Sequence, residues 1–153
     1  LYEGGIRVPF VARWPGKIKP GTTNDLPVAM WDVMPTCLEI AGVESPAGID
    51  GISYLPALLG QMDQQLKHPY LYWAFYERGG KQAVRWGNWK GVRNEVGKKP
   101  DSMLELYQLS TDIGETNNVA VQHPEIVKQI DAFMVEAYTP SPLWSFGGRK
   151  KKK

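Results

Sequence analysis

The stretch "QAVRWGNWKGVR" (residues 82–93) carries the strongest local signal of the fold. Two runs of alternating apolar and polar residues flank Gly87-Asn88, and such a pair is typical of the two-residue turn of a β-hairpin. The stretch therefore predicts two antiparallel strands joined at this turn. Trp86 and Trp89 flank the turn, and we expect them to pack as a cross-strand aromatic pair rather than bind a substrate.

Two further strands and a helix surround the predicted hairpin. The aromatic run "YLYWAFYE" (70–77) precedes it, and "LELYQL" (104–109) follows it. The run "HPEIVKQIDAFMVEAY" (123–138) has the apolar spacing of an amphipathic helix, with a proline suited to its first position. These elements predict an α+β fold, in which a four-stranded antiparallel sheet is packed by a C-terminal helix near residues 124–138. The apolar stripe of this helix is formed by Ile126, Ile130, Phe133 and Ala137.

The first 60 residues look like the end of a different layer. "GIRVPFVARW" (5–14) is typical of a strand interrupted at Pro9, since proline cannot donate to a ladder. "DVMPTCLEIAG" (32–42) predicts a short buried helix over residues 32–41, capped by Asp32 and ended by Gly42. Its apolar stripes contain Cys37, which we expect in the core. This segment has too few strands to form a sheet alone.

Composition and charge exclude several classes of protein. Hydrophobic residues make up 42% of the chain and charged residues 22%, an ordinary globular balance. The net charge is +2, but five of the 18 Lys and Arg lie at residues 149–153. Against 16 Asp and Glu, the remaining 13 give the body a net charge of −3, unsuited to nucleic-acid binding. The basic end is expected to be a solvated tail, with weak binding to an anionic surface as the alternative.

No self-sufficient active site is visible in the sequence. His68 and His123 both precede prolines, and a structural role is favoured for each. The polar run "STDIGETNN" (110–118) lacks the ligand spacing of a calcium loop and is expected to be a plain turn. The single cysteine allows no internal disulfide, and no apolar run approaches the length of a membrane span. We therefore predict no catalytic residue and no metal ligand in this chain.

The order of several short motifs resembles a known family. The motifs are "LYEGGIRVPFVARWPGKIKPG" (1–21), D-x-x-P-T-C-L-E-I-A-G (32–42), "IDGIS" (49–53), "GGKQAVRWGNWKGVR" (79–93) and "ELYQLSTDIGETNNVAVQHPEIV" (105–127). Together they resemble the C-terminal third of the formylglycine-dependent sulfatases, the arylsulfatase family of the alkaline-phosphatase-like superfamily. The resemblance extends from Leu1 to about Leu143.

The resemblance implies chemistry that these residues do not contain. Such enzymes hydrolyse sulfate esters with a formylglycine made from the Cys or Ser of a C/S-x-P-x-R motif, and with a calcium ion that polarises the sulfate. Cys37 is followed by Leu-Glu-Ile and does not match that motif. The resemblance therefore implies that calcium and formylglycine belong to a full-length enzyme, whose missing N-terminal catalytic portion lies upstream of Leu1. It also favours a periplasmic or secreted location.

The same resemblance divides the chain into parts. Residues 1–66 would be the end of the catalytic α/β domain, with its last strand and helix. Residues 67–143 would form the antiparallel α+β subdomain, and residues 144–153 a disordered basic tail.

Two groups of candidate site residues follow. Glu3, Gly4, Gly5 and Arg7 come directly after the family's catalytic ligands and are expected near the active site. For Glu3 and Arg7, ion pairs that brace the fold are favoured over contacts with sulfate. The glycines would permit a close backbone approach or a positive φ. The second group lies in "FYERGGKQ" (75–82), which joins two strands, and is expected to contact a sulfated sugar: Tyr76, Glu77, Arg78 and Lys81.

The sequence thus indicates the C-terminal part of a sulfatase that completes the fold and shapes the substrate entrance. Its partners would be the N-terminal portion and, in the full-length enzyme, a sulfated carbohydrate or an aryl sulfate ester. By itself the chain is expected to be inactive. The alternative is a stand-alone carbohydrate-binding or interaction domain, which would require Trp73, Trp86 and Trp89 to be exposed.

Overall fold

The computed structural model describes residues 1–141 and 143–146, which form two compact units. The first, here called the sheet unit, contains Leu1–Val8 and the described residues from Pro69 onward. The second, the helical unit, contains Pro9–His68. The division at residue 66 between a catalytic domain and a subdomain concerns the complete protein and stays a prediction.

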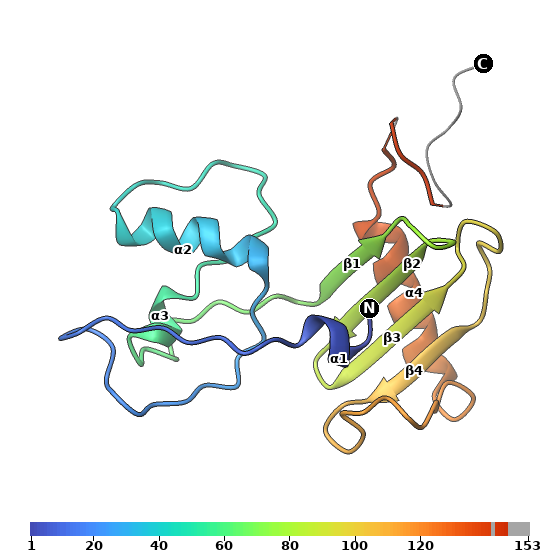
Figure 1. The fold of residues 1–153 in the computed structure, drawn as a ribbon, viewed down its shortest axis with the longest axis horizontal. Coiled ribbons are helices and arrows are strands. Elements are labelled where there is room, and N and C mark those ends of the chain that lie inside the picture. The colour runs from blue at the N-terminus through green and yellow to red at the C-terminus, as the bar shows by residue number, and fades with distance from the viewer. Residues whose placement is uncertain (142, 147–153) are drawn as a thin grey trace. The chain divides into compact units, whose positions relative to one another are not determined.

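Four antiparallel strands form the sheet in the order of the sequence, β1-β2-β3-β4 (Figure 1). One long helix, α4 (Pro124–Ala137), packs against β1 and β2. The predicted α+β class, with a four-stranded antiparallel sheet and a C-terminal helix, is confirmed. The strands are β1 (Leu71–Phe75), β2 (Lys81–Trp86), β3 (Trp89–Asn94) and β4 (Leu104–Gln108).

The predicted hairpin joins β2 and β3. Trp86 lies directly opposite Trp89, so only Gly87 and Asn88 form the turn. Gly87 has a φ of 57°, the left-handed conformation that a tight hairpin turn requires at its first central position. The Trp86 ring packs edge-on to Phe133 of α4 at 5.6 Å, which supports the structural role expected for it.

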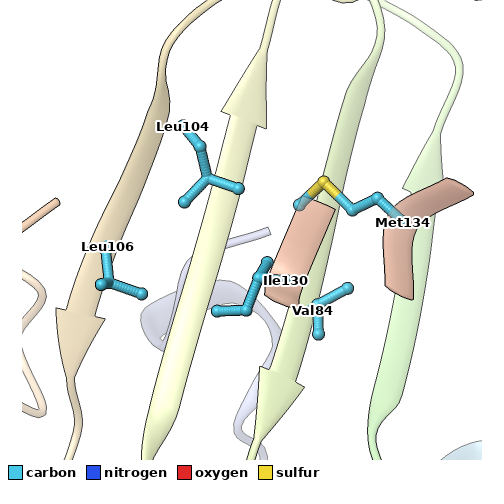
Figure 2. Close-up of a cluster of buried hydrophobic side chains, with 5 residues drawn as sticks. All are labelled: Val84, Leu104, Leu106, Ile130 and Met134. Atoms are coloured by element: carbon cyan, nitrogen blue, oxygen red, sulfur yellow. The ribbon is translucent and has the colours of Figure 1, made fainter. Parts of the chain in front are cut away.

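The main core lies between the sheet and α4. Val84, Leu104, Leu106, Ile130 and Met134 form a buried cluster there, and Figure 2 shows the two helix residues among the strand residues. Gly91 of β3 leaves room for the helix, since a Cβ at this position would lie 2.6 Å from Cγ2 of Ile130. We call this side of the sheet the α4 face.

The opposite side of the sheet is covered in part by α1 (Glu3–Ile6), a single helical turn visible in blue in Figure 1. The strand predicted for residues 5–14 is therefore wrong: Gly5 and Ile6 are helical, and residues 7–14 have no regular structure. A strand needs a hydrogen-bonded neighbour, and none of the described strands pairs with this segment. We call this side of the sheet the α1 face.

The helical unit contains the helix predicted at residues 32–41. It is observed as α2 (Val33–Ile40), preceded by the 3-10 turn η1 (Met30–Asp32), and a short helix α3 (Leu55–Leu58) follows. Gly42 ends α2 with a φ of 69°: its N–H donates to Glu39, and the N–H of Val43 donates to Leu38. The predicted stop at Gly42 is confirmed.

The buried side of α2 differs from the prediction. Cys37 is exposed, as are Met34 and Ile40, so the expectation of a core cysteine is wrong for this chain. The buried residues are Asp32, Pro35 and Thr36. Helical periodicity identifies an apolar stripe but does not tell which side of the helix the rest of the chain covers.

The end of the described chain packs on the sheet unit. The Phe146 ring stacks on Tyr76 at 4.8 Å and on Tyr138 at 5.1 Å, so packed structure continues beyond residue 143. The rest of the predicted disordered tail, residues 147–153, lies outside the described residues. Among the helices that are described, none combines the length and apolar composition needed to cross a bilayer.

Candidate functional site

A fully buried lysine lies at the centre of the α1 face. Side chains alternate along β3, so Gly91 faces α4 while Lys90 faces α1. The Nζ atom of Lys90 lies 2.7 Å from Oε1 of Glu3 and 5.5 Å from the centre of the Trp73 ring. A buried ammonium group requires a charged partner, and Glu3 supplies it from α1.

Glu3 is the residue through which α1 contacts the sheet. Its side chain is only 4% exposed, and its carboxylate lies 3.9 Å from the guanidinium groups of both Arg7 and Arg85. The backbone N–H of Glu3 donates to the side chain of Glu115. Both the carboxylate and the amide of one residue are therefore held by groups that lie far away in the sequence.

Glu115 belongs to the turn after β4, which the sequence predicts as a plain polar turn. It has a φ of 52°, in the left-handed region that residues other than glycine rarely adopt. Its side chain is 3% exposed, and burial raises the pKa of this carboxyl group. One carboxylate oxygen accepts from Glu3, whereas the other lies 3.7 Å from Nζ of Lys90 and makes no hydrogen bond.

The conformation of this turn is stabilised by Asp112. Its carboxylate accepts hydrogen bonds from the backbone N–H groups of Thr116 and Asn117, and from the Thr116 hydroxyl. These bonds favour the charged form and lower the pKa of Asp112. The turn that holds Glu115 is thus fixed by its own residues.

A second polar group holds the start of α1. The hydroxyl of Tyr2 donates to Glu105 of β4 and accepts from the side-chain amide of Asn94 at 3.0 Å. The hydroxyl of Tyr107 also donates to Glu105, and burial together with this bond raises the pKa of Tyr107. Tyr2 and Glu3 are therefore both attached to the α1 face.

The first group of predicted site residues lies on α1 or directly beside it. Glu3 points to the sheet, whereas Gly4 and Gly5 are exposed and a Cβ on either would have no heavy atom within 4 Å. Neither glycine has a positive φ, so the predicted need for one is not observed, and the close-approach alternative stays open. The Arg7 side chain is 58% exposed, and its 3.9 Å distance from Glu3 is too long for a hydrogen bond.

The second group is divided between two environments. The ring of Tyr76 is stacked on Phe146, so this side of it is covered by the chain itself. Glu77 and Arg78 are exposed at the tip of the β1–β2 loop, where Arg78 has a φ of 51°. Lys81 is half-buried on the α1 face, in the row of β2 residues that also contains Arg85.

Lys90 and Glu115 were not predicted from the sequence. The position of Lys90 in the predicted hairpin does indicate burial. Lys90 lies two residues from the buried Val92, on the same face of an inner strand. Glu115 carries no such signal, since its burial depends on how the turn folds back toward α1.

A smaller polar group lies within the helical unit. Asp32 is fully buried and accepts from the backbone N–H groups of Ala29 at 2.7 Å and Ile52 at 2.9 Å. The ring Nε2 of His68 lies 2.8 Å from the same carboxylate. Asp32 therefore joins three segments instead of capping α2, and His68 has the structural contact expected for it. Within the part of the chain that the structure describes, no three His, Cys, Asp or Glu residues form a cluster that could hold a metal ion.

Comparison with known proteins gives one consistent family. The family described as "N-sulphoglucosamine sulphohydrolase, C-terminal" matches residues 1–139. Arylsulfatase K of Danio rerio is 31% identical over 140 residues, which are 88% of this chain and 26% of that protein. The N-acetylgalactosamine-6-O-sulfatase of Bacteroides thetaiotaomicron is 30% identical over 152 residues, covering 90% of this chain and 28% of that protein.

A solved structure has a similar fold. It comes from work on glycosaminoglycan metabolism by Bacteroides thetaiotaomicron, is 28% identical, and superposes with a TM-score of 0.66 over 88% of this chain and 29% of its own. The chain thus spans about a quarter of the length of the curated relatives it matches.

Proposed function

Because the chain belongs to the family of N-sulphoglucosamine sulphohydrolase C-terminal domains, we propose that it is the C-terminal part of a sulfuric ester hydrolase. The match over residues 1–139 is the observation that carries this proposal. The relatives named above are sulfatases, and this chain aligns with about a quarter of each. Its role would be to complete the fold and shape the substrate entrance of the full-length enzyme.

The proposed substrate is a sulfated carbohydrate or an aryl sulfate ester. Exposed cations support this class, since a guanidinium group binds sulfate oxygens with paired N–H donors. Arg7 beside α1 and Arg78 in the β1–β2 loop both reach solvent. Tyr76 is a weaker candidate, because Phe146 already stacks on its ring.

Formylglycine and calcium would be supplied by the N-terminal portion of the full-length enzyme. The residues of this chain do not fit either group. Cys37 is followed by Leu38, Glu39 and Ile40 instead of the C-x-P-x-R pattern, and the described residues hold no cluster of metal ligands. In this proposal, the groups that react with the sulfate ester therefore lie outside this chain. The residues of this chain would bind and orient the substrate. We also propose a periplasmic or secreted location for the full-length enzyme.

A stand-alone carbohydrate-binding domain is the less favoured function. It would need exposed indole rings, but Trp86 and Trp89 pack against the core cluster. Trp73 lies beneath the ammonium group of Lys90. These rings already have structural contacts within the sheet unit.

The proposal is tested by expressing the complete coding sequence together with a formylglycine-generating activity. We expect the full-length protein to release sulfate from an aryl sulfate or from sulfated monosaccharides. The 153-residue chain alone should show no turnover. A full-length protein that carries formylglycine and releases no sulfate from either substrate class would refute the proposal.

A further inference from the structure

The single turn of α1 has little stability of its own. It contains four residues, two of which are glycines, and its N-cap residue makes no side-chain capping bond. One isolated helical turn is unstable in water, and glycine is one of the weakest helix-forming residues. Contacts with the sheet unit must therefore determine where α1 lies.

Two residues supply the main contacts with Glu3. Lys90 binds the Glu3 carboxylate at 2.7 Å, and Glu115 accepts the Glu3 backbone N–H. A side chain and a backbone amide that are held by different residues fix both the position and the orientation of the turn. The bond from Tyr2 to Glu105 adds a third attachment one residue earlier.

Both anchoring residues are themselves rigidly placed. Lys90 lies in the interior of an inner strand and has no exposed surface. Glu115 is held in the left-handed conformation by the turn that Asp112 stabilises. A non-glycine residue in this conformation is strained, and such strain concentrates at functional sites.

The side of α1 away from the sheet is open. Gly4 and Gly5 are exposed, and a Cβ on either would meet no heavy atom within 4 Å. Nothing within the described chain therefore requires glycine here, whereas glycine allows another backbone to come close. Two adjacent glycines on the outer side of an anchored turn suit a surface that must be placed accurately against a second segment.

We propose that Lys90 and Glu115 are positioning residues of the sulfatase reaction, which hold α1 through Glu3. This inference rests on the proposed function, in which the catalytic groups come from residues that precede Leu1. Movement of α1 would displace those groups, and a displacement of about 1 Å lowers turnover on the order of 100-fold. Neither residue needs to touch the substrate for this effect.

The test compares Glu115→Ala with Glu115→Gln in the full-length protein. The alanine variant loses the acceptor of the Glu3 N–H, whereas glutamine retains an acceptor oxygen of the same reach. We expect Glu115→Ala to lower kcat for a small aryl sulfate on the order of 100-fold while KM changes little. Amide exchange in residues 2–7 should become faster in this variant. Glu115→Gln should keep both values close to those of the wild type.

A matched control lies on β3, the strand that contains Lys90, but on the α4 face of the sheet. Arg93 forms an ion pair of 2.6 Å with Asp131 of α4. Arg93→Met should lower stability without a change in kcat or in the exchange of residues 2–7. The double variant Glu3→Gln/Lys90→Met removes both charges of the Lys90 pair and provides a second measurement. Its kcat should fall as in Glu115→Ala.

The outcomes separate this inference from the function on which it rests. Absence of turnover in the wild-type protein would refute the proposed function. Normal kcat in Glu115→Ala and in the double variant, with an active wild type, would refute the positioning role alone. An equal loss of kcat in Arg93→Met would also refute it, because general destabilisation would then explain the effect.

Discussion

Lys90 and Glu3 form an ion pair of 2.7 Å between almost fully buried side chains, although 87 residues separate them in the sequence. Removing two charges from water costs several kcal/mol per ion, and their attraction offsets this cost only when both partners are present. Arg85, at 3.9 Å from Glu3, is a weaker second partner. The pair therefore behaves as a unit, in which loss of one member leaves a buried charge behind.

Replacement of Lys90 tests this coupling directly. Lys90→Met leaves the Glu3 carboxylate without its closest cation and should lower the free energy of unfolding by about 3–5 kcal/mol. The double variant Glu3→Gln/Lys90→Met removes both charges and should lose less. Urea unfolding of the two variants and the wild type measures the difference.

The control for this prediction is an exposed pair. Lys98 lies 3.8 Å from Glu95, and both side chains are more than half exposed. Lys98→Met should change stability by no more than about 0.5 kcal/mol. If Lys90→Met costs as little as Lys98→Met, the buried pair does not have the energetic role assigned to it.

Glu115 predicts a pH dependence of stability. Burial raises its folded-state pKa above the ordinary value of 4.5, so the folded state binds a proton more tightly than the unfolded state. The resulting stabilisation is complete below pH 4.5 and is lost as the pH rises through the folded-state pKa. Because Glu115→Gln has no such proton, the wild type should lose stability relative to this variant over that window. Urea unfolding at a series of pH values would show it.

Asp112 provides the comparison of opposite sign in the same turn. Hydrogen bonds lower its pKa below 3.8, so its contribution is present above that pH and is lost as the pH falls through the folded-state pKa. The wild type should therefore lose stability relative to Asp112→Asn on acidification. If stability changes with pH in the same direction in both comparisons, Glu115 cannot be assigned as a buried carboxyl group while Asp112 is assigned as a hydrogen-bonded one.

Gly91 should tolerate no side chain. In Gly91→Ala the new methyl group would lie 2.6 Å from Cγ2 of Ile130 and 3.3 Å from Cδ2 of Leu104. Overpacking of this kind costs about 1–3 kcal/mol, which thermal unfolding would detect. Gly4→Ala is the control, because its methyl group meets no atom within 4 Å and alanine favours the helical turn. Equal stability of the two variants would mean that α4 does not pack against β3 this closely.

Asp32 should be essential for the helical unit. Asp32→Ala leaves the backbone N–H groups of Ala29 and Ile52 without their acceptor, at about 1–3 kcal/mol each. We expect faster amide exchange at these two positions and lower protease resistance of residues 9–68. Asp25→Ala changes an exposed carboxylate in the same unit and should have neither effect.

The sheet could be predicted because its signals are local. Gly87-Asn88 lies between alternating runs, and the amphipathic pattern of residues 124–137 is long enough to be unambiguous. The first turn could not be predicted, because the contacts of α1 with the sheet unit come from residues far away in the sequence, such as Lys90 and Glu115. A local sequence pattern does not indicate contacts between residues that are far apart in the sequence.

The prediction that the apolar residues of α2 are buried was wrong for a related reason. The periodicity of Met34, Cys37 and Ile40 is helical, but these residues are exposed in this chain. For the candidate site, Glu3 and Arg7 were predicted through resemblance, whereas Lys90 and Glu115 required the register of β3 and the path of the turn after β4. The sequence shows which residue types are present, but it does not show which of them lie in contact in the folded chain.

The distance along the chain between α1 and its anchors also orders the events of synthesis and folding. β2 and β3 need only close a two-residue turn. Glu3 can form its contacts only after Lys90 and Glu115 have been synthesised, and Glu115 follows Glu3 by 112 residues. Closing a longer segment loses more chain entropy, and contacts between distant residues form late. On the ribosome, residues 1–8 therefore emerge long before their partners exist. During that interval a chaperone would meet α1 as an unfolded peptide, and only the completed turn after β4 would end its exposure.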